Sequence, residues 1–281
     1  MDNEFASQAH SDYRSARFRA FMNDILATLK RERNTLLDYD EVKEQLRIGG
    51  PIYRGVRTVR VDQIVGSLNR YQEFDRVFLP RVEQTAERWE SVSRAFYKEI
   101  SLPPVVLYKV GQVYFVVDGH HRVSVARQQG QEFIDAEVRE CSTRVNITPD
   151  LKPEDLKILR SKVNFLEASE LDRIRPDANI KLTIPDGFAR MLEHIAVHRY
   201  FMGLEQQRDI SEKEAVADWY DTVYMPIVRV IRESGILEEF PRKTEGDLYL
   251  WVLDHQRMLS EQGEELQPPE DAARGFIEDK E

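Results

Sequence analysis

The sequence lacks several features that define large classes of proteins. It contains one cysteine, Cys141, which excludes an intramolecular disulfide and a zinc site made of several cysteines. No apolar run approaches the roughly 18 residues that cross a bilayer as a helix, and the start has no signal-peptide pattern. We therefore expect a cytoplasmic protein with no membrane partner.

Two nucleotide-binding signatures and an excess of basic residues are also missing. The chain of 281 residues has neither the glycine-rich Rossmann fingerprint nor a P-loop. Its 50 Asp and Glu against 40 Lys and Arg give a net charge of −10, which disfavours nucleic acid as a partner held mainly through phosphates. A local basic face would still allow such a contact, so nucleic-acid binding stays a possible but disfavoured alternative.

The most informative stretch is residues 114–130, where an apolar run ends in a turn and helical spacing follows. Residues 114–117 are β-branched or aromatic, which predicts a buried strand. The dipeptide Asp118-Gly119 predicts a turn, and Gly130 ends the helical pattern. The sequence therefore predicts a strand, a turn and a helix in direct succession.

The first turn of that helix carries a compact set of polar side chains, His120, His121 and Arg122. Helix N-termini have unpaired N–H groups and a partial positive charge, so they suit anionic ligands. We interpret the turn that begins at Gly119 as a phosphate-binding site. Asp118 is then placed to hold a metal ion or to take a proton.

A second candidate region is the polar loop at residues 67–76. The residues expected to contact phosphate or sugar are Asn69, Arg70 and Gln72. Tyr71 could stack on a base, and Glu73 is the candidate general base, with Asp75 as a second carboxylate. The alternative for each of these residues is a surface loop whose polar side chains face water.

Residues 57–139 resemble the ParB/sulfiredoxin-like fold family. The expected elements follow the family's order: a strand at 58–61, a helical turn at 62–66, the polar loop, a helix, two strands, the turn, a helix and a strand at 133–138. The family's phosphate-binding turn is a glycine followed by polar residues and an arginine, which Gly119 and Arg122 match. The resemblance implies an α+β fold with a small mixed sheet, flanked by an N-terminal helix and a C-terminal helical domain.

The departures from the family bear on activity. Sulfiredoxin has a catalytic cysteine directly after the turn glycine, where this chain has His120, so sulfiredoxin chemistry is excluded. Chromosome-partitioning ParB proteins carry glutamate and arginine where His120 and His121 stand. The Asp-Gly-His-His-Arg turn is most similar to the branch that includes nucleotide-dependent free-serine kinases. This resemblance implies ATP or ADP (or CTP) and Mg²⁺ as cofactors.

We expect five segments along the chain. These are an N-terminal helical arm (1–50), the ParB/sulfiredoxin-like domain (51–147), a linker with short helices (148–185), a helical C-terminal domain (186–259) and a disordered acidic tail (260–281). The helical domain resembles an uncharacterised bacterial domain that accompanies ParB-like domains.

Two further helices are predicted outside the turn. Residues 11–46 are expected to form one helix, whose apolar stripe would pack on the rest of the protein or on a partner. The stripe consists of Phe18, Phe21, Met22, Ile25, Leu26 and Leu29. Pro80 is expected in the first turn of a helix that runs to about Ile100.

Two function classes remain, and we favour the first slightly. In the first, the domain transfers a phosphoryl group from ATP or ADP to a small hydroxyl metabolite. Arg122 and the helix N-terminus would hold phosphate oxygens, His120 or His121 would donate to the transferred group, and Asp118 would hold Mg²⁺. In the second, the bound nucleotide controls dimerisation, giving a possible homodimer, or DNA contact, without kinase activity. A scaffold with a decayed phosphate turn is the third alternative.

Overall fold

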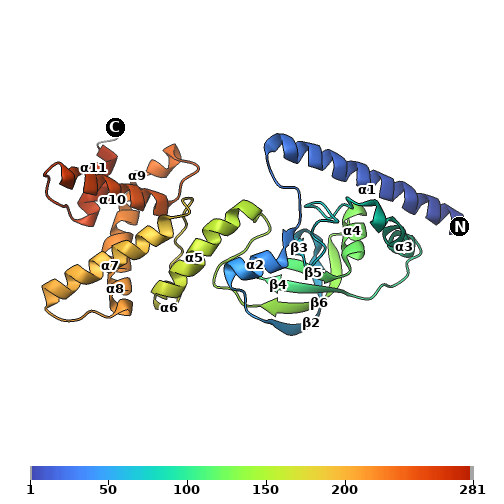
Figure 1. Ribbon diagram of the computed structural model, residues 1–281, viewed down its shortest axis with the longest axis horizontal. Helices are drawn as coiled ribbons and strands as arrows, with labels where there is room; N and C mark the ends of the chain where they lie inside the picture. The colour runs from blue at the N-terminus through green and yellow to red at the C-terminus, as the bar shows by residue number, and fades with distance from the viewer. Residues whose placement is uncertain (1, 279–281) are drawn as a thin grey trace. The chain divides into compact units, whose positions relative to one another are not determined.

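The computed structural model describes residues 2–278 of the chain (Figure 1). The chain divides into two compact units, Met1–Leu156 and Lys157–Glu281. Our division into five segments stays a prediction. Among residues 2–278, no helix is both long and apolar enough to span a membrane.

The first unit is built on a mixed sheet that, within the described residues, has six strands in the order β1-β3-β5-β4-β6-β2. The strands are β1 (Leu37–Asp38), β2 (Pro51–Arg60), β3 (Ile64–Ser67), β4 (Val105–Val110), β5 (Val113–Asp118) and β6 (Phe133–Cys141). The pairs β1/β3, β3/β5 and β4/β6 are parallel, whereas β4/β5 and β2/β6 are antiparallel. This arrangement confirms the predicted α+β class.

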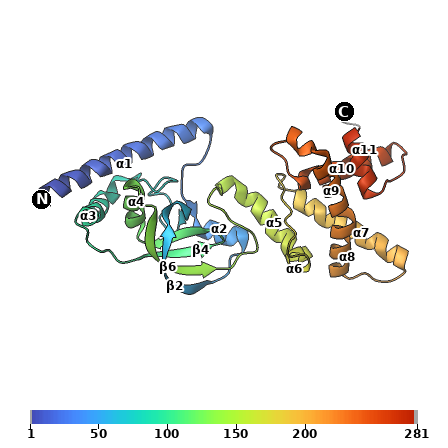
Figure 2. The same cartoon turned by 180° about the vertical axis from the view of Figure 1, so that it is seen from behind.

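Four helices of the first unit accompany this sheet: α1 (Asp2–Lys30), α2 (Tyr39–Leu46), α3 (Ala86–Tyr97) and α4 (His120–Gln128). Helix α1 lies along α3 (Figures 1 and 2). The Tyr13 hydroxyl on α1 donates to the carbonyl oxygen of Val82 at 3.0 Å, and the Tyr13 ring packs on Trp89 of α3. Helix α1 is thereby fixed against the segment that leads into α3.

The predicted single helix over residues 11–46 is wrong. Helix α1 ends at Lys30, and the chain returns as strand β1 followed by α2. Leu36 and Leu37 are buried. Leu37 lies in an extended segment that pairs with β3. Asp38 then accepts a hydrogen bond from the Asp40 N–H and begins α2 as its N-cap.

The apolar stripe of α1 does not pack on the rest of its unit. Its six residues are between 39% and 75% exposed. The buried face of α1 is instead made of small residues and one tyrosine, namely Ala9, Tyr13, Ala16 and Ala20. Alanine allows α1 to approach α3 closely, so the larger side chains lie on the opposite side of the helix.

The predicted helical turn at 62–66 is also only partly correct. A 3-10 turn at Val61–Gln63 is followed by strand β3, which pairs with both β1 and β5. Gly66 makes this pairing possible, because a Cβ there would lie 2.3 Å from the Phe115 ring on β5. The hairpin between β4 and β5 turns at Gly111, which has φ +59°.

The loop before α3 is folded by one buried carboxylate. Oδ1 of Asp75 accepts from the backbone N–H groups of Val77 and Leu79 at 3.0 and 2.8 Å, and Oδ2 accepts from the Asn23 amide on α1 at 2.9 Å. Pro80 forms a β-bridge with Phe74, and α3 begins only at Ala86. The prediction of a helix from Pro80 is therefore wrong, and Asp75 has a structural role.

The second unit is helical. Its elements are α5 (Leu156–Ser169), α6 (Leu171–Ile174), α7 (Gly187–Gln206), α8 (Glu212–Trp219), α9 (Met225–Ser234), α10 (Glu245–Glu261) and α11 (Pro269–Glu278). Ser211 caps α8, with its hydroxyl accepting from the Glu214 N–H. The expectation of a disordered tail is wrong for residues 269–278, because α11 buries Ala272 and Ala273 and packs on α9 and α10.

Replacing Asp75 tests its role in the loop. We expect Asp75→Ala to lower the free energy of unfolding by about 2–4 kcal/mol, because two backbone N–H groups and one amide lose their acceptor. Asn23→Ala, which removes one of the three donors, should lower it by about 1 kcal/mol. Urea unfolding measures both effects. Asp135→Ala, at an exposed carboxylate bonded to Thr58, is the control, and an equal loss there would contradict this role.

Candidate functional site

The junction between β5 and α4 forms as predicted and sets the position of the site. Strand β5 ends at Asp118, and Gly119 follows with φ +97°. A Cβ on Gly119 would also lie 2.6 Å from Val105 Cγ1 on β4, so both the backbone conformation and the space require glycine. Gly119, the N-cap residue of α4, makes no side-chain cap hydrogen bond. The N–H groups of its first turn therefore receive no hydrogen bond from an N-cap side chain.

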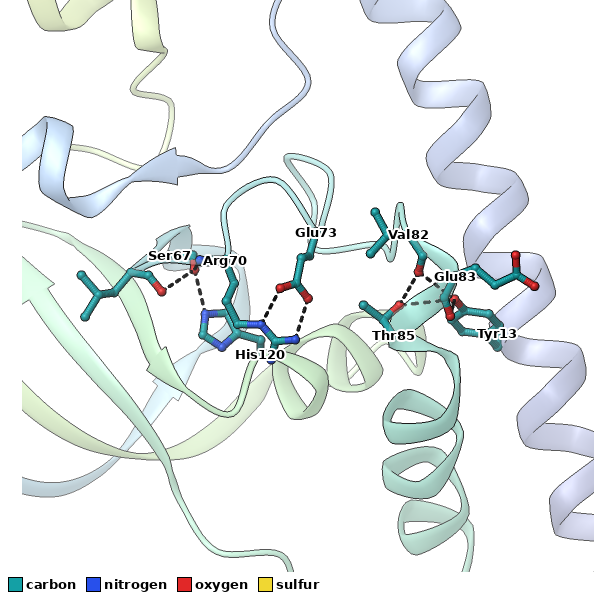
Figure 3. Close-up of polar contacts among 9 residues, drawn as sticks. Tyr13, Ser67, Arg70, Glu73, Val82, Glu83, Thr85 and His120 are labelled. Carbon is teal, nitrogen blue, oxygen red and sulfur yellow. Dashed lines mark hydrogen bonds and ion pairs between the residues drawn. The ribbon is translucent and has the colours of Figure 1, made fainter.

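His120 is held between the β3 end and the polar loop. Its Nε2 lies 2.7 Å from the Ser67 hydroxyl, and its ring stacks on Phe74 with the centroids 6.2 Å apart. Burial, together with the positive charge of Arg70, lowers the pKa of His120 to about 4. His120 is therefore neutral at pH 7, and Figure 3 shows its contact with Ser67.

His121 is buried without a hydrogen-bond partner. His121 is 8% exposed, and neither nitrogen of its ring forms a hydrogen bond within residues 2–278. The ring meets Phe74 edge-on at 5.6 Å. Burial, with Arg70 as the next cause, lowers the pKa of His121 to about 4. Buried polar atoms are nearly always paired in native proteins, so this imidazole is the unusual feature of the site.

The polar loop contributes an ion pair next to the two histidines. The Arg70 guanidinium donates to both carboxylate oxygens of Glu73, at 2.8 and 2.6 Å (Figure 3). This bond to Arg70 lowers the pKa of the Glu73 carboxyl, which makes Glu73 a weaker base than a free glutamate. The predicted base role of Glu73 stays a prediction, and in this structure Glu73 is the counter-ion of Arg70.

Arg122 and the two histidines of the Asp-Gly-His-His-Arg turn face different surroundings. Arg122 bonds to Asp118 Oδ2 at 2.6 Å, to the Pro104 carbonyl oxygen at 3.0 Å and to the Pro103 carbonyl oxygen. It therefore lies toward the start of β4. The histidines lie instead toward Ser67 and Phe74. Arg122 in this position braces the turn, and its predicted phosphate contact stays a prediction.

The remaining predicted residues are not drawn into this cluster. Asn69 has a left-handed backbone, with φ +70°. Gln72 donates to the Tyr71 hydroxyl at 3.3 Å, and Tyr71 packs against the hydrophobic core. Stacking of Tyr71 on a base would require this ring to move.

A metal site made by protein ligands alone is not found. No group of three or more His, Cys, Asp or Glu side chains within residues 2–278 could hold a metal ion. Mg²⁺ in nucleotide sites needs one or two carboxylates plus phosphate oxygens and water, and the Asp118 side chain is 71% exposed. The donor set therefore fits a metal that arrives with phosphates.

Sequence reasoning missed two residues of the site, Ser67 and Phe74. Ser67 ends β3, and β3 is the parallel neighbour of β5. Polar residues that follow adjacent parallel strands meet at the same sheet edge. Recognising residues 64–67 as a strand would have placed Ser67 beside His120.

Comparisons with known proteins give a match within the first unit. Residues 54–152 match the ParB N-terminal domain. The C-terminally truncated chromosome-partitioning protein ParB from Caulobacter crescentus, complexed with CTP-gamma-S, is similar over 80% of this chain and 99% of its own, at 14% identity and a TM-score of 0.24. A Pnob8-like ParB-N domain matches over 69% of this chain and 87% of its own, at 10% identity and a TM-score of 0.22. No curated protein matches the chain.

Replacing the two histidines should have opposite effects on stability. We expect His121→Phe to raise the free energy of unfolding by about 1–2 kcal/mol, because it removes a buried polar group without a partner. His120→Phe should lower it, because the Ser67 hydroxyl loses its partner. Chemical denaturation of both variants measures the difference.

The pH dependence of the free energy of unfolding is a second test of the state of His121. A histidine with a pKa of about 4 when folded and about 6.5 when unfolded binds more protons in the unfolded state between these values. The free energy of unfolding therefore falls as pH drops from about 6.5 to 4. His121→Phe should make this fall shallower, and an unchanged slope would contradict the buried, neutral state of His121.

Proposed function

We propose that the protein, whose residues 54–152 form a ParB-like domain, binds a nucleotide with its phosphates at the N-terminus of α4. The observation that carries the proposal is His121, whose two ring nitrogens are buried without partners at the first turn of a helix whose N-cap, Gly119, makes no side-chain cap bond. A phosphate oxygen would accept from that imidazole and from the backbone N–H groups beside it. The ligand would thereby supply the acceptors that these donors lack.

The charges around the histidines support an anionic ligand. Arg70 and Arg88 both place positive charge near His121. The imidazoles themselves are neutral at pH 7, so each can donate one hydrogen bond from its single N–H group. Glu73 opposes the ligand, because its carboxylate occupies Arg70 and repels phosphate. Nucleotide binding would therefore exchange the Glu73 carboxylate for phosphate oxygens on the Arg70 guanidinium.

Substitutions on the two sides of this ion pair should change affinity in opposite directions. We expect Arg70→Ala to weaken binding by about tenfold to a hundredfold, the value of a charge-assisted hydrogen bond. Glu73→Gln should tighten binding, because it removes both the competitor and the repulsion. Titration calorimetry with ATP, ADP, CTP and GTP in the presence of Mg²⁺ measures the affinities.

Arg139→Ala is the matched control for this experiment. Arg139 on β6 also pairs with a carboxylate, that of Glu137 at 3.0 Å, and its removal changes the net charge equally. A loss of affinity in Arg139→Ala as large as that in Arg70→Ala would contradict a specific site. Binding of none of the four nucleotides to the wild-type protein would overturn the proposal.

Phosphoryl transfer to a small hydroxyl metabolite is the second candidate function. The observation that favours it is the exposed carboxylate of Asp118, one residue before the turn glycine. At that position it could hold the Mg²⁺ that accompanies the phosphates or orient an acceptor hydroxyl. Without such chemistry, the domain would be a nucleotide-binding regulatory or DNA-contacting module.

Asp118→Asn separates these two functions. If Asp118 takes part in transfer, its rate should fall by about 10²–10³ while nucleotide affinity is largely kept, because the substitution preserves shape but removes charge. The assay follows nucleotide consumption with a pool of small hydroxyl compounds, serine included. Equal rates in both forms, or no consumption by the wild-type protein, would leave nucleotide binding without phosphoryl transfer.

A further inference from the structure

Helix α1 has two apolar faces on opposite sides. The inner face packs on α3 through alanines and Tyr13. The outer stripe consists of Phe18 (64% exposed), Phe21 (60%), Met22 (39%), Ile25 (39%), Leu26 (50%) and Leu29 (75%). Successive residues of a helix are rotated by about 100°, which places the outer stripe about 180° from Ala16 and Ala20. A contiguous apolar patch of this kind on a folded unit marks an interaction surface.

The outer stripe is confined to one half of the helix. Towards the N-terminus the same side of α1 carries Ser11, Arg14 and Ser15, which are exposed and polar. Lys30 and Arg31 follow the stripe at its other end. The apolar surface therefore covers about three helical turns and has defined ends.

The pattern of the stripe is self-complementary. Its central residues 18, 22, 25 and 29 alternate in spacings of four and three, as in the apolar seam of a coiled coil. A two-fold axis perpendicular to the helix, at the level midway between residues 23 and 24, brings an antiparallel copy of α1 into register. Each residue of this central seam then lies level with an apolar residue of the second copy, in the pairs Phe18 with Leu29 and Met22 with Ile25, and Phe21 and Leu26 flank the seam on either side. Interfaces with two-fold symmetry require this self-complementarity.

We propose that two copies of this chain associate through the outer stripes of their α1 helices, antiparallel and about a two-fold axis. Phenylalanine has roughly 150–250 Å² of surface, and at about 200 Å² for each of the six residues the exposed fractions amount to roughly 600 Å² per copy. Two copies would bury about 1,200 Å², which reaches the lower range of stable interfaces. The second copy covers the stripe that α1 leaves open in its own unit.

The charges at the ends of the stripe predict how this dimer responds to salt. Antiparallel copies bring Arg14 of one helix near the end of the other, where Lys30 and Arg31 lie. These like charges are exposed, so salt screens their repulsion and should tighten the dimer. Binding of the same stripe to an anionic bilayer or an acidic partner would weaken with salt instead.

Sedimentation equilibrium of the full chain tests the proposal. We expect the wild-type protein to have twice the mass of one chain at micromolar concentration, and Ile25→Glu to raise the dimer dissociation constant at least a hundredfold. Ile25 is already part-exposed in one copy, so this variant should keep its circular dichroism spectrum and melting temperature. Val197→Glu, which alters an exposed apolar residue of α7 (55% exposed), is the matched control and should dimerise like the wild type.

Cysteine cross-linking tests the antiparallel register. The natural Cys141 is buried and does not compete. A mixture of Met22→Cys and Ile25→Cys chains should form a disulfide-linked dimer several times faster than either variant alone. Faster linking of each variant with itself would overturn the antiparallel arrangement.

Two results would overturn the dimer itself. The first is a wild-type protein that stays monomeric up to high micromolar concentration at both low and high salt. The second is a monomer that binds vesicles of phosphatidylglycerol through the same residues, shown by loss of co-sedimentation in Ile25→Glu. Neither result depends on whether the α4 site binds a nucleotide.

Discussion

The buried carboxylate of Asp75 is the interaction on which the arrangement of the first unit depends. It accepts hydrogen bonds from two backbone N–H groups of its own loop and from Asn23 of α1. A carboxylate buried without such donors would carry a large desolvation penalty, so the loop can close only in the conformation that supplies them. That conformation places Phe74 against both histidines and presents the ion pair of Arg70 and Glu73 beside them.

Two of the arginines at the α4 site are paired without a ligand. Arg70 is neutralised by Glu73 and Arg122 by Asp118, and burial keeps both histidines uncharged at pH 7. In the proposed nucleotide site, selectivity for an anion would rest on hydrogen-bond donors that have no acceptor and on an ion pair that can exchange partners. Such a site would favour ligands with several oxygens in a fixed arrangement over simple anions, because one oxygen cannot satisfy all the donors.

The parts of the fold that local signals determine could be predicted from the sequence. The β5–turn–α4 unit could be predicted because each of its signals is local. The apolar run indicates the strand, Asp118-Gly119 the turn and Gly130 the end of the helix. Strand β3 was missed because its four residues are strand only through pairing with β1 and β5, and Gly66 weakens any local preference. Pro80 suggested a helix start, but the long-range bond between Asn23 and Asp75 determines the loop.

The candidate site was predicted in position and only partly in chemistry. His120 and His121 lie at the helix start as expected, yet their neutral state depends on burial by residues such as Phe74, which come from another segment. No spacing rule within residues 114–130 contains that information. Likewise, the bonds of Arg122 to the carbonyl groups of Pro103 and Pro104 could not be predicted from the sequence, because those residues lie in a distant segment; its phosphate contact stays a prediction.

The hydrogen bond between Asn23 and Asp75 has a thermodynamic consequence. Asn23 lies on the inner side of α1, level with the middle of the outer stripe, and Asp75 lies two residues after Glu73 in the loop beside α4. A shift of α1 on self-association would be transmitted to the loop by this single bond, and rearrangement of the loop around a ligand would be transmitted back. Any coupling between the two equilibria must be reciprocal: the factor by which ligand tightens self-association equals the factor by which self-association tightens ligand binding.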